Sequence, residues 1–229
     1  MELIEDFEAN FEKYALGFQT HDEDLTRHVL LKVAHTERVR REILHIGKSL
    51  GLEESDLLIA DIAALFHDIG RFEQYARYRT YVDSQSEDHA RLSEKILREN
   101  CFIEGLDHDT REIVLFSIRC HNRLSLPEKS DERLLLFAKL LRDADKLDIF
   151  FLVTDQYRRN PTQSDSAVDL GFPDGDDVSS EVLEDLRRRR IVDFRHVRNR
   201  NDFKLLQAGW AFERECPETL RRRPVIGNR

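Results

Sequence analysis

The sequence predicts an all-α protein, and three observations support that prediction. Apolar residues recur every three or four positions through most of the first 150 residues, which is the period of an amphipathic helix. Alternation of apolar and polar residues, the pattern of a half-buried strand, is scarce, and no Asn-Gly turn joins two apolar runs. Glycine and proline are few before about residue 160, so long helices can form without a break.

Two helices are expected in the first 70 residues. Residues 25–50 place leucine, valine and isoleucine on one face, and Gly51 supplies a natural C-terminal stop. Residues 56–69 form a strongly apolar segment that Gly70 is expected to close.

Three further helices are expected before residue 155. Ser86 can cap a helix that runs to about Glu99, and Asp109 can open another that ends near His121. Asp131 opens a fifth helix, which reaches about Val153 and is apolar on most of its faces. Such a helix is expected in a central, buried position. Residues 1–155 are therefore predicted to form the main helical domain.

The composition changes after the fifth helix. Residues 155–180 are polar and rich in Asp, with Pro and Gly, which predicts a long loop that is either a mobile surface segment or a lid over an active site. Two shorter helices are expected at about 181–194 and 202–215. Residues 156–229 are therefore expected to form a C-terminal helical extension that packs on the same domain.

The bulk composition limits the classes of partner and location. The chain has 229 residues, of which 40% are hydrophobic, and a formal net charge of −9, so it can fill a core but offers no general attraction to nucleic acid. Its 3 cysteines are widely spaced and form no CxxC pair, which fits a reducing compartment. Neither a signal-peptide core nor an apolar run of membrane-spanning length is visible. We expect a cytoplasmic protein without a membrane partner.

Two basic stretches near the C-terminus could suggest nucleic-acid binding. In residues 187–190, acidic residues four positions earlier (Glu184 before Arg188, Asp185 before Arg189) favour an ion-paired helix surface instead. Residues 195–202 could also fold over a site and bind phosphate through their arginines. The overall acidity favours a solvated surface for both stretches.

Six residues stand out as candidate metal ligands. Four histidines lie on or beside the apolar faces of four predicted helices: His35, His67, His89 and His121. Two carboxylates follow apolar segments, Asp68 directly after His67 and Asp145 in the central helix. Each carboxylate would be costly to bury alone, and shared cations would remove that cost. Imidazole and carboxylate together suit divalent transition metals, and also Mg²⁺ or Mn²⁺.

Each of these residues also has an ordinary structural explanation. A single core histidine is usually a hydrogen-bonded structural residue. Asp68 could cap a turn, and Asp145 could pair with Arg142 or Lys146. The joint pattern, and the pair His67-Asp68 above all, favours a metal site.

Three segments resemble the successive motifs of the HD superfamily, which is named for its His-Asp doublet. They are HTERV at 35–39, FHDIGRF at 66–72 and DADKLD at 143–148. The superfamily comprises all-helical metal-dependent phosphohydrolases and their relatives, so the resemblance, over about residues 25–155, implies an HD-type helical bundle. It also implies one metal site made of His35, His67, Asp68 and Asp145, with Asp143 as a rival for the last position.

Some members of the superfamily carry two more histidines between the doublet and the final Asp, as in dinuclear HD phosphodiesterases, HD-GYP proteins and myo-inositol oxygenase. His89 and His121 stand at similar positions here, and His108 is a rival for the second of them. The resemblance therefore implies two divalent ions bridged by Asp68. Mn, Mg, Fe, Co, Ni and Zn all remain candidates.

The resemblance implies attack of a metal-bound water on a phosphate ester, with Asp68, Arg71 and Lys146 as the candidate catalytic residues. Substrate-binding candidates follow the doublet: Arg71 and Arg79, together with Arg77, for phosphate, and Gln74 and Tyr78 for a base or sugar. The alternative is that most of these are solvated loop residues.

The leading functional hypothesis is a phosphomonoesterase or phosphodiesterase acting on a nucleotide or other small phosphate ester. The GYP signature is absent, and the chain is short for the large dNTP triphosphohydrolases, so the substrate stays open. A di-iron oxygenase of HD type and a catalytically silent nucleotide-binding HD module are the alternatives. The expected partner is a small phosphorylated substrate, and a homodimer is left open.

Overall fold

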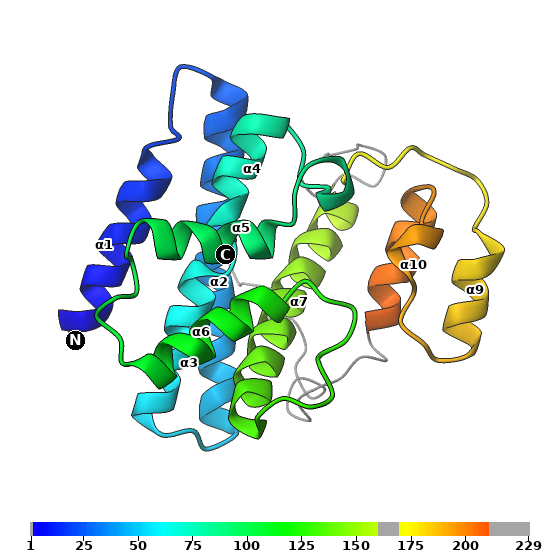
Figure 1. Ribbon diagram of the computed structural model, residues 1–229. Helices are drawn as coiled ribbons and strands as arrows, with labels where there is room; N and C mark the ends of the chain where they lie inside the picture. Colours follow the sequence, from blue (N-terminus) through cyan, green and yellow to red (C-terminus); the bar gives the residue numbers. More distant parts are fainter. Residues whose placement is uncertain (1, 160–169, 211–229) are drawn as a thin grey trace. The chain divides into compact units, whose positions relative to one another are not determined.

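A computed structural model of the chain describes residues 2–159 and 170–210. Within these ranges the regular structure is helical and no strand is present, which confirms the all-α prediction (Figure 1). The chain divides into two compact units, Met1–Asp148 and Ile149–Arg229. None of the described helices has both the length and the apolar character that crossing a membrane requires.

The first unit contains most of the helices. In chain order they are α1 (Glu2–Leu16), α2 (Glu23–Ser49), α3 (Glu54–Phe66), α4 (Gly70–Tyr78), α5 (His89–Glu99), α6 (His108–Cys120) and the start of α7 (Glu132–Arg159), with a short 3₁₀ turn, η1 (Asp83–Gln85), between α4 and α5. Helix α2 packs on α3 and α4, α3 packs on α1 and α6, and α5 packs on α4 and α6 (Figure 1).

Side chains that precede the helices set where they begin. Asp88 caps α5 by accepting hydrogen bonds from the backbone N–H groups of Ala90 and Arg91, and Asp107 caps α6 in the same way. The predicted caps, Ser86 and Asp109, are therefore wrong by two residues each. Asp88 and Asp107 are the N-caps because their carboxylates accept hydrogen bonds from free N–H groups and are stabilised by the positive end of the helix dipole.

The prediction that Gly70 closes a helix is wrong, because α3 ends at Phe66 and Gly70 begins α4. Glycine is required here by close packing rather than by a stop. A Cβ at Gly70 would lie 2.6 Å from the carbonyl oxygen of His89 and 2.7 Å from the backbone nitrogen of Ser93. The Ser93 hydroxyl accepts from the Gly70 N–H at 2.9 Å and donates to the His67 carbonyl at 2.8 Å, so α5 is held against the His67-Asp68 segment.

Aromatic side chains of α1 pack against the residues that flank the His67-Asp68 segment. Phe7 and Phe11 of α1 contact the ring of Phe66, at centroid distances of 6.2 and 6.3 Å. Phe11 also contacts Phe72 of α4 at 5.7 Å. Phe66 and Phe72 are almost fully buried, so burial of these rings fixes the two helices on either side of His67-Asp68.

Helix α7 has a fully buried face, formed by Phe137, Leu140, Leu141 and Ala144, while its apolar residues 134–136 and 149–152 are only partly buried. Its central position stays a prediction. Its predicted end near Val153 is wrong, because the helix continues to Arg159. The predicted loop at 155–180 therefore begins later than expected, and residues 160–169 of it lie outside the described part of the chain.

The second unit holds α9 (Ser180–Arg187), a 3₁₀ turn η2 (Phe194–His196) and α10 (Arg200–Gly209), around an apolar cluster that includes Val182 and Phe203. The helix predicted over 181–194 stops early, because Arg189 adopts a left-handed conformation with φ of 53°. The predicted pair of Glu184 and Arg188 forms at 2.6 Å. The second predicted helix begins at Arg200, and residues 211–215 lie outside the described residues. Packing of this extension on the main domain stays a prediction.

Candidate metal centre

The first unit brings the six candidate ligands together from five parts of the chain. They come from α2 (His35), the segment between α3 and α4 (His67 and Asp68), the first residue of α5 (His89), the C-terminal end of α6 (His121) and α7 (Asp145). Five of them are buried, and the Asp145 side chain is 16% exposed. Their polar atoms form two groups that meet at Asp68.

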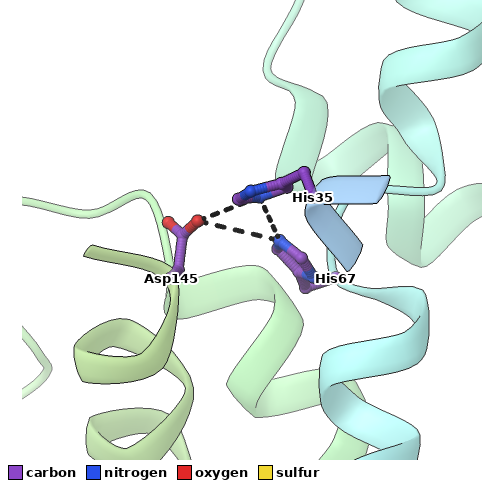
Figure 2. Close-up of side chains that lie close together, drawn as sticks. All are labelled: His35, His67 and Asp145. Carbon is purple, nitrogen blue, oxygen red and sulfur yellow. Dashed lines mark hydrogen bonds and ion pairs between the residues drawn. The ribbon is translucent and has the colours of Figure 1, made fainter. Parts of the chain in front are cut away.

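The first group consists of His35, His67 and Asp145, which point toward one another from three helical segments (Figure 2). The Nε2 atoms of the two histidines lie 3.2 Å apart. Asp145 Oδ1 lies 3.2 Å from His35 Nε2 and 3.8 Å from His67 Nε2. Asp68 Oδ2 adds a fourth donor, at 3.5 Å from His35 Nε2 and 3.7 Å from His67 Nε2.

The second group consists of Asp68, His89 and His121. Asp68 Oδ1 lies 3.5 Å from His89 Nε2 and 3.6 Å from His121 Nε2, and the two Nε2 atoms are 3.0 Å apart. The two carboxylate oxygens of Asp68 thus face different histidine pairs. This is the arrangement that a carboxylate bridging two metal ions requires.

The orientation of the imidazole rings shows why these groups suit cations. His67 Nδ1 lies 2.7 Å from the Ala64 carbonyl oxygen and His121 Nδ1 lies 2.6 Å from the Ile118 carbonyl oxygen. A carbonyl can only accept, so Nδ1 carries the hydrogen and Nε2 presents a lone pair. Both rings sit at the C-terminal end of a helix, where carbonyl groups lack an intrahelical partner.

Carboxylates orient the other two rings in the same way. His35 Nδ1 lies 2.6 Å from Asp148 Oδ2, and His89 Nδ1 lies 2.7 Å from Asp83 Oδ2. In the neutral form of each ring the Nδ1 hydrogen is directed outward, and Nε2 presents a lone pair to its group. Histidine that binds a metal through one nitrogen commonly donates its other N–H to a carboxylate or carbonyl in this way.

Asp68 supplies a further sign that a cation belongs here. Its Oδ1 atom is buried and has no hydrogen-bond partner, although a buried carboxylate oxygen without one is costly. Its Oδ2 atom accepts a hydrogen bond from Lys32 Nζ at 2.8 Å. The unpartnered oxygen, the inward lone pairs and the nitrogen–oxygen donor set all fit divalent metal ions.

The charges of the site keep three of its ligands, His67, His89 and Asp68, in the forms that bind metal. Burial lowers the pKa of His67 to about 4, and burial together with Arg71 lowers the pKa of His89 to about 4. Burial would raise the pKa of Asp68, but Lys32, His67 and Arg71 outweigh it and hold that pKa well below its usual value. At neutral pH the two imidazoles are therefore neutral and the carboxylate is ionised, as metal coordination requires. Burial and Lys32 would also lower the pKa of His35, but Asp145 and Asp148 outweigh them and raise it, so a cation would have to displace a proton from this ring.

The substrate-binding candidates fall into two sets. Arg71 borders the site, with Nε 3.5 Å from Asp68 Oδ1. Gln74 lies nearby but is fully buried, and its amide bonds to Asp83, Ser86, the Glu87 carbonyl and Arg71. These internal bonds occupy its donors and make it part of the scaffold behind Arg71.

Tyr78 and Arg79 are not brought to the metal ligands by any described contact. Tyr78 is 43% exposed at the end of α4, and Arg79 pairs with Asp22 at 2.6 Å. Arg79 is also the left-handed C-cap residue of α4, which directs the chain away after Tyr78. Arg77 pairs with Glu73 and Glu87. Tyr78 is exposed, and Arg77 and Arg79 are paired with other carboxylates, whereas Arg71 lies beside Asp68. The four residues thus differ in position, although all follow the same His-Asp doublet.

The remaining candidates are placed as follows. Of the two rivals, Asp145 joins the first group, while Asp143 is buried and belongs to neither group. His108 is 87% exposed at the start of α6, which leaves His121 in the second group. Lys146 follows Asp145 on α7 and is partly buried, and a catalytic role for it stays a prediction.

Sequence reasoning missed three residues that contact the ligands: Lys32, Asp83 and Asp148. Lys32 lies three positions before His35 and Asp148 three positions after Asp145, so both share a helical face with a ligand and could have been found by that spacing. Asp83 lies in the 3₁₀ turn between α4 and α5, where no periodic pattern marks it.

Comparison with protein-family models gives one match, to the model described as HD domain, over residues 33–149. The matched segment is just over half of the chain and includes all six candidate ligands. The comparisons with curated proteins and with solved structures gave no match.

Proposed function

Because the chain belongs to the HD-domain family, we propose that it is a metal-dependent phosphohydrolase acting on a nucleotide or another small phosphate ester. The family is made up mostly of metal-dependent hydrolases, and clusters of His and Asp that could hold a metal are present here. Membership of the family follows from the matching family model, whereas the reaction and the class of substrate are what we propose.

One observation supports the proposal above the others: Asp68 directs its two oxygens at two histidine pairs whose Nε2 atoms present lone pairs. In the proposal, His35, His67, Asp68 Oδ2 and Asp145 hold one divalent ion, and Asp68 Oδ1, His89 and His121 hold a second. Two ions so placed would supply a nucleophilic hydroxide near neutral pH and neutralise the charge that develops on phosphate oxygens.

The protein's own groups position the reaction. Arg71 is held by the Tyr81 carbonyl and by Asp83, at 2.6 and 3.3 Å, and its guanidinium borders Asp68. A guanidinium fixed in this way can orient a phosphate by paired hydrogen bonds. The second group is open to a further ligand, since only three donors from described residues meet there. Lys146 is proposed as a second cation acting on the substrate from the side of Asp145.

Metal analysis followed by a phosphate-release screen tests the proposal. Protein purified without oxygen is expected to contain two divalent ions per chain, and to release phosphate from a nucleotide or a small phosphate ester. Asp68→Asn is expected to lose both ions and the activity, because the bridging charge is removed. Asp56→Asn, an equivalent change on α3 whose carboxylate pairs with Arg133, is the matched control and should keep both.

Three outcomes would contradict the proposal or its assignment of ligands. Two irons with oxygen consumption and no phosphate release would favour oxygenase chemistry. Tight nucleotide binding without turnover, across Mn²⁺, Mg²⁺, Co²⁺ and Fe²⁺, would favour a binding module. An Asp68→Asn variant that keeps both ions would refute the assignment of ligands.

We further propose that the protein works in the cytoplasm on a small phosphorylated molecule. The described thiols, Cys101 and Cys120, are both free, which suits a reducing compartment. Gel filtration with light scattering would decide between a monomer and a homodimer.

A further inference from the structure

Lys32 contacts the bridging carboxylate but has no role in the site as proposed so far. It lies on α2, one turn before His35, and its ammonium donates to Asp68 Oδ2 at 2.8 Å. Its side chain is 15% exposed, so the ammonium lies at the boundary between the buried ligands and solvent. The other contact that the structure gives the ammonium is the ring of Tyr81, 5.2 Å from its nitrogen.

Lys32 and Arg71 both lie against the ring of Tyr81. The Arg71 guanidinium also lies over the Tyr81 ring, at 5.5 Å, and its Nε faces Asp68 Oδ1 at 3.5 Å. Each oxygen of Asp68 therefore has one side-chain cation beside it. The Arg71 Nε atom is buried and has no hydrogen-bond partner, so the pair has donor capacity that the protein does not use.

Lys32 would share its carboxylate partner with a metal ion once Asp68 Oδ2 serves as a ligand. The electron density that Oδ2 offers the ammonium would then be shared with a doubly charged ion, and the two positive charges would repel. A lysine side chain can swing on its four-carbon stem, whereas the α2 backbone that carries it stays fixed beside His35. The ammonium would remain near the site with only part of its counter-charge.

The charge of the loaded site indicates what would complete that counter-charge. Two carboxylates and four neutral imidazoles balance only half the charge of two divalent ions. Outside the ligands, Asp83 offsets the charge of Arg71 and Asp148 offsets that of Arg38, while Lys32 adds to the excess. Such a site favours the dianion of a phosphate monoester over the single charge of a diester.

We propose that Lys32 binds the phosphoryl group of the substrate together with Arg71, and that the substrate is a phosphate monoester. The inference rests on the proposed function. Its test is the equilibrium binding of inorganic phosphate to the Mn²⁺-loaded protein, measured by calorimetry, with dimethyl phosphate as the singly charged comparison. Neither measurement requires turnover.

The expected results concern Lys32→Met and its controls. Methionine keeps the length of the stem and favours helix, so only the charge is lost. Lys32→Met should bind two Mn²⁺ ions at least as tightly as wild type, yet bind inorganic phosphate about 10- to 100-fold more weakly, the range for a hydrogen bond to a charged group. Lys32→Arg should recover part of the loss. Lys95→Met, at an exposed lysine of α5 that pairs with Glu99, should bind phosphate as wild type does.

Three outcomes would overturn the inference. One is phosphate affinity in Lys32→Met equal to that of wild type with both ions bound. Another is loss of metal in both Lys32→Met and Lys32→Arg, which would make Lys32 part of the metal site. The third is binding of dimethyl phosphate as tight as that of inorganic phosphate. Phosphate binding that depends on Lys32, without hydrolysis of any ester, would refute the proposed function alone, and hydrolysis with Lys32-independent binding would refute this inference alone.

Discussion

Asp83 offers the sharpest test of how the protein orients a metal ligand, because its neighbours decide what an isosteric change would do. Asp83 Oδ2 accepts from His89 Nδ1 at 2.7 Å and from the Asn122 amide at 3.2 Å. Its Oδ1 accepts from Gln74 Nε2 at 2.9 Å and from Arg71 Nη1 at 3.3 Å. In Asp83→Asn the amide oxygen is expected to take the Oδ1 position, since the charged donor Arg71 lies there and the exposed Asn122 amide can turn its own oxygen toward the new NH₂ group.

The amide NH₂ would then face His89 Nδ1 and donate to it. His89 Nδ1 also lies 2.9 Å from Asp83 Oδ1, but its shorter contact is with the NH₂ position. That contact favours the tautomer with the hydrogen on Nε2, directed at the second metal group, which cannot bind a metal. Loss of a residue that orients a metal ligand typically costs 10- to 100-fold in affinity, and the reversed tautomer predicts the upper end, about 100-fold, or about 3 kcal/mol. The first group should keep its affinity, because Asp83 contacts none of its three members.

The assay is a Mn²⁺ titration by calorimetry, with electron paramagnetic resonance to distinguish a coupled pair of ions from a single one. Asp83→Asn is expected to bind one ion with wild-type affinity and to lose the coupled signal. Asp88→Asn is the matched control: Asp88 caps α5 beside Asp83, and asparagine caps a helix as well as aspartate does. Equal weakening of both ions, or no weakening of either, would refute the reasoning.

Three further predictions concern packing and charge. Gly70→Ala should destabilise the protein by about 3 kcal/mol or more, because the new Cβ would lie 2.6 Å from the His89 carbonyl oxygen; a melting temperature close to wild type would contradict this. Arg142 is buried and donates to the carbonyl groups of Cys120 and Arg123, on either side of His121. Arg142→Met should therefore lose the second ion and keep the first. Elemental analysis that still finds both ions would refute this prediction. The metal-free protein should lose stability as the pH falls from 6.5 toward 4. In the folded protein His67 and His89 have a pKa of about 4, whereas an unfolded histidine has about 6.5, so the unfolded chain binds more protons in this range. The expected loss is on the order of 3 kcal/mol for each of the two histidines. Urea unfolding of chelator-treated protein at several pH values measures that slope, and a flat profile would contradict it.

Most helices could be predicted from the sequence because their signals are local. The three-to-four-residue period over residues 25–50 and the apolar run after Asp131 correspond to α2 and α7 within a few residues, apart from the end of α7. The errors lie where packing overrides local preference. Gly70 looks like a helix stop in sequence, yet its hydrogen-sized side chain is needed because α5 packs directly against it.

The identities of the six candidate ligands were predictable as well, since polar groups on apolar helical faces are costly and therefore informative. What the sequence could not supply is their grouping. That Asp68 directs Oδ2 at His35 and His67, and Oδ1 at His89 and His121, depends on contacts between residues far apart in the chain.

The surroundings of the ligands were decided by tertiary structure alone. Spacing after the doublet made Arg71 and Arg79 equal candidates, but packing holds the first against Asp68 and leaves the second paired with Asp22. Asp83 reaches His89 from a short turn without periodicity. The sequence by itself indicated which residues could bind metal, with Asp143 and His108 left as rivals, because residue type and helical period are local properties. Only the folded chain decided which atoms meet and which cations border them, because those distances depend on how separate helices pack.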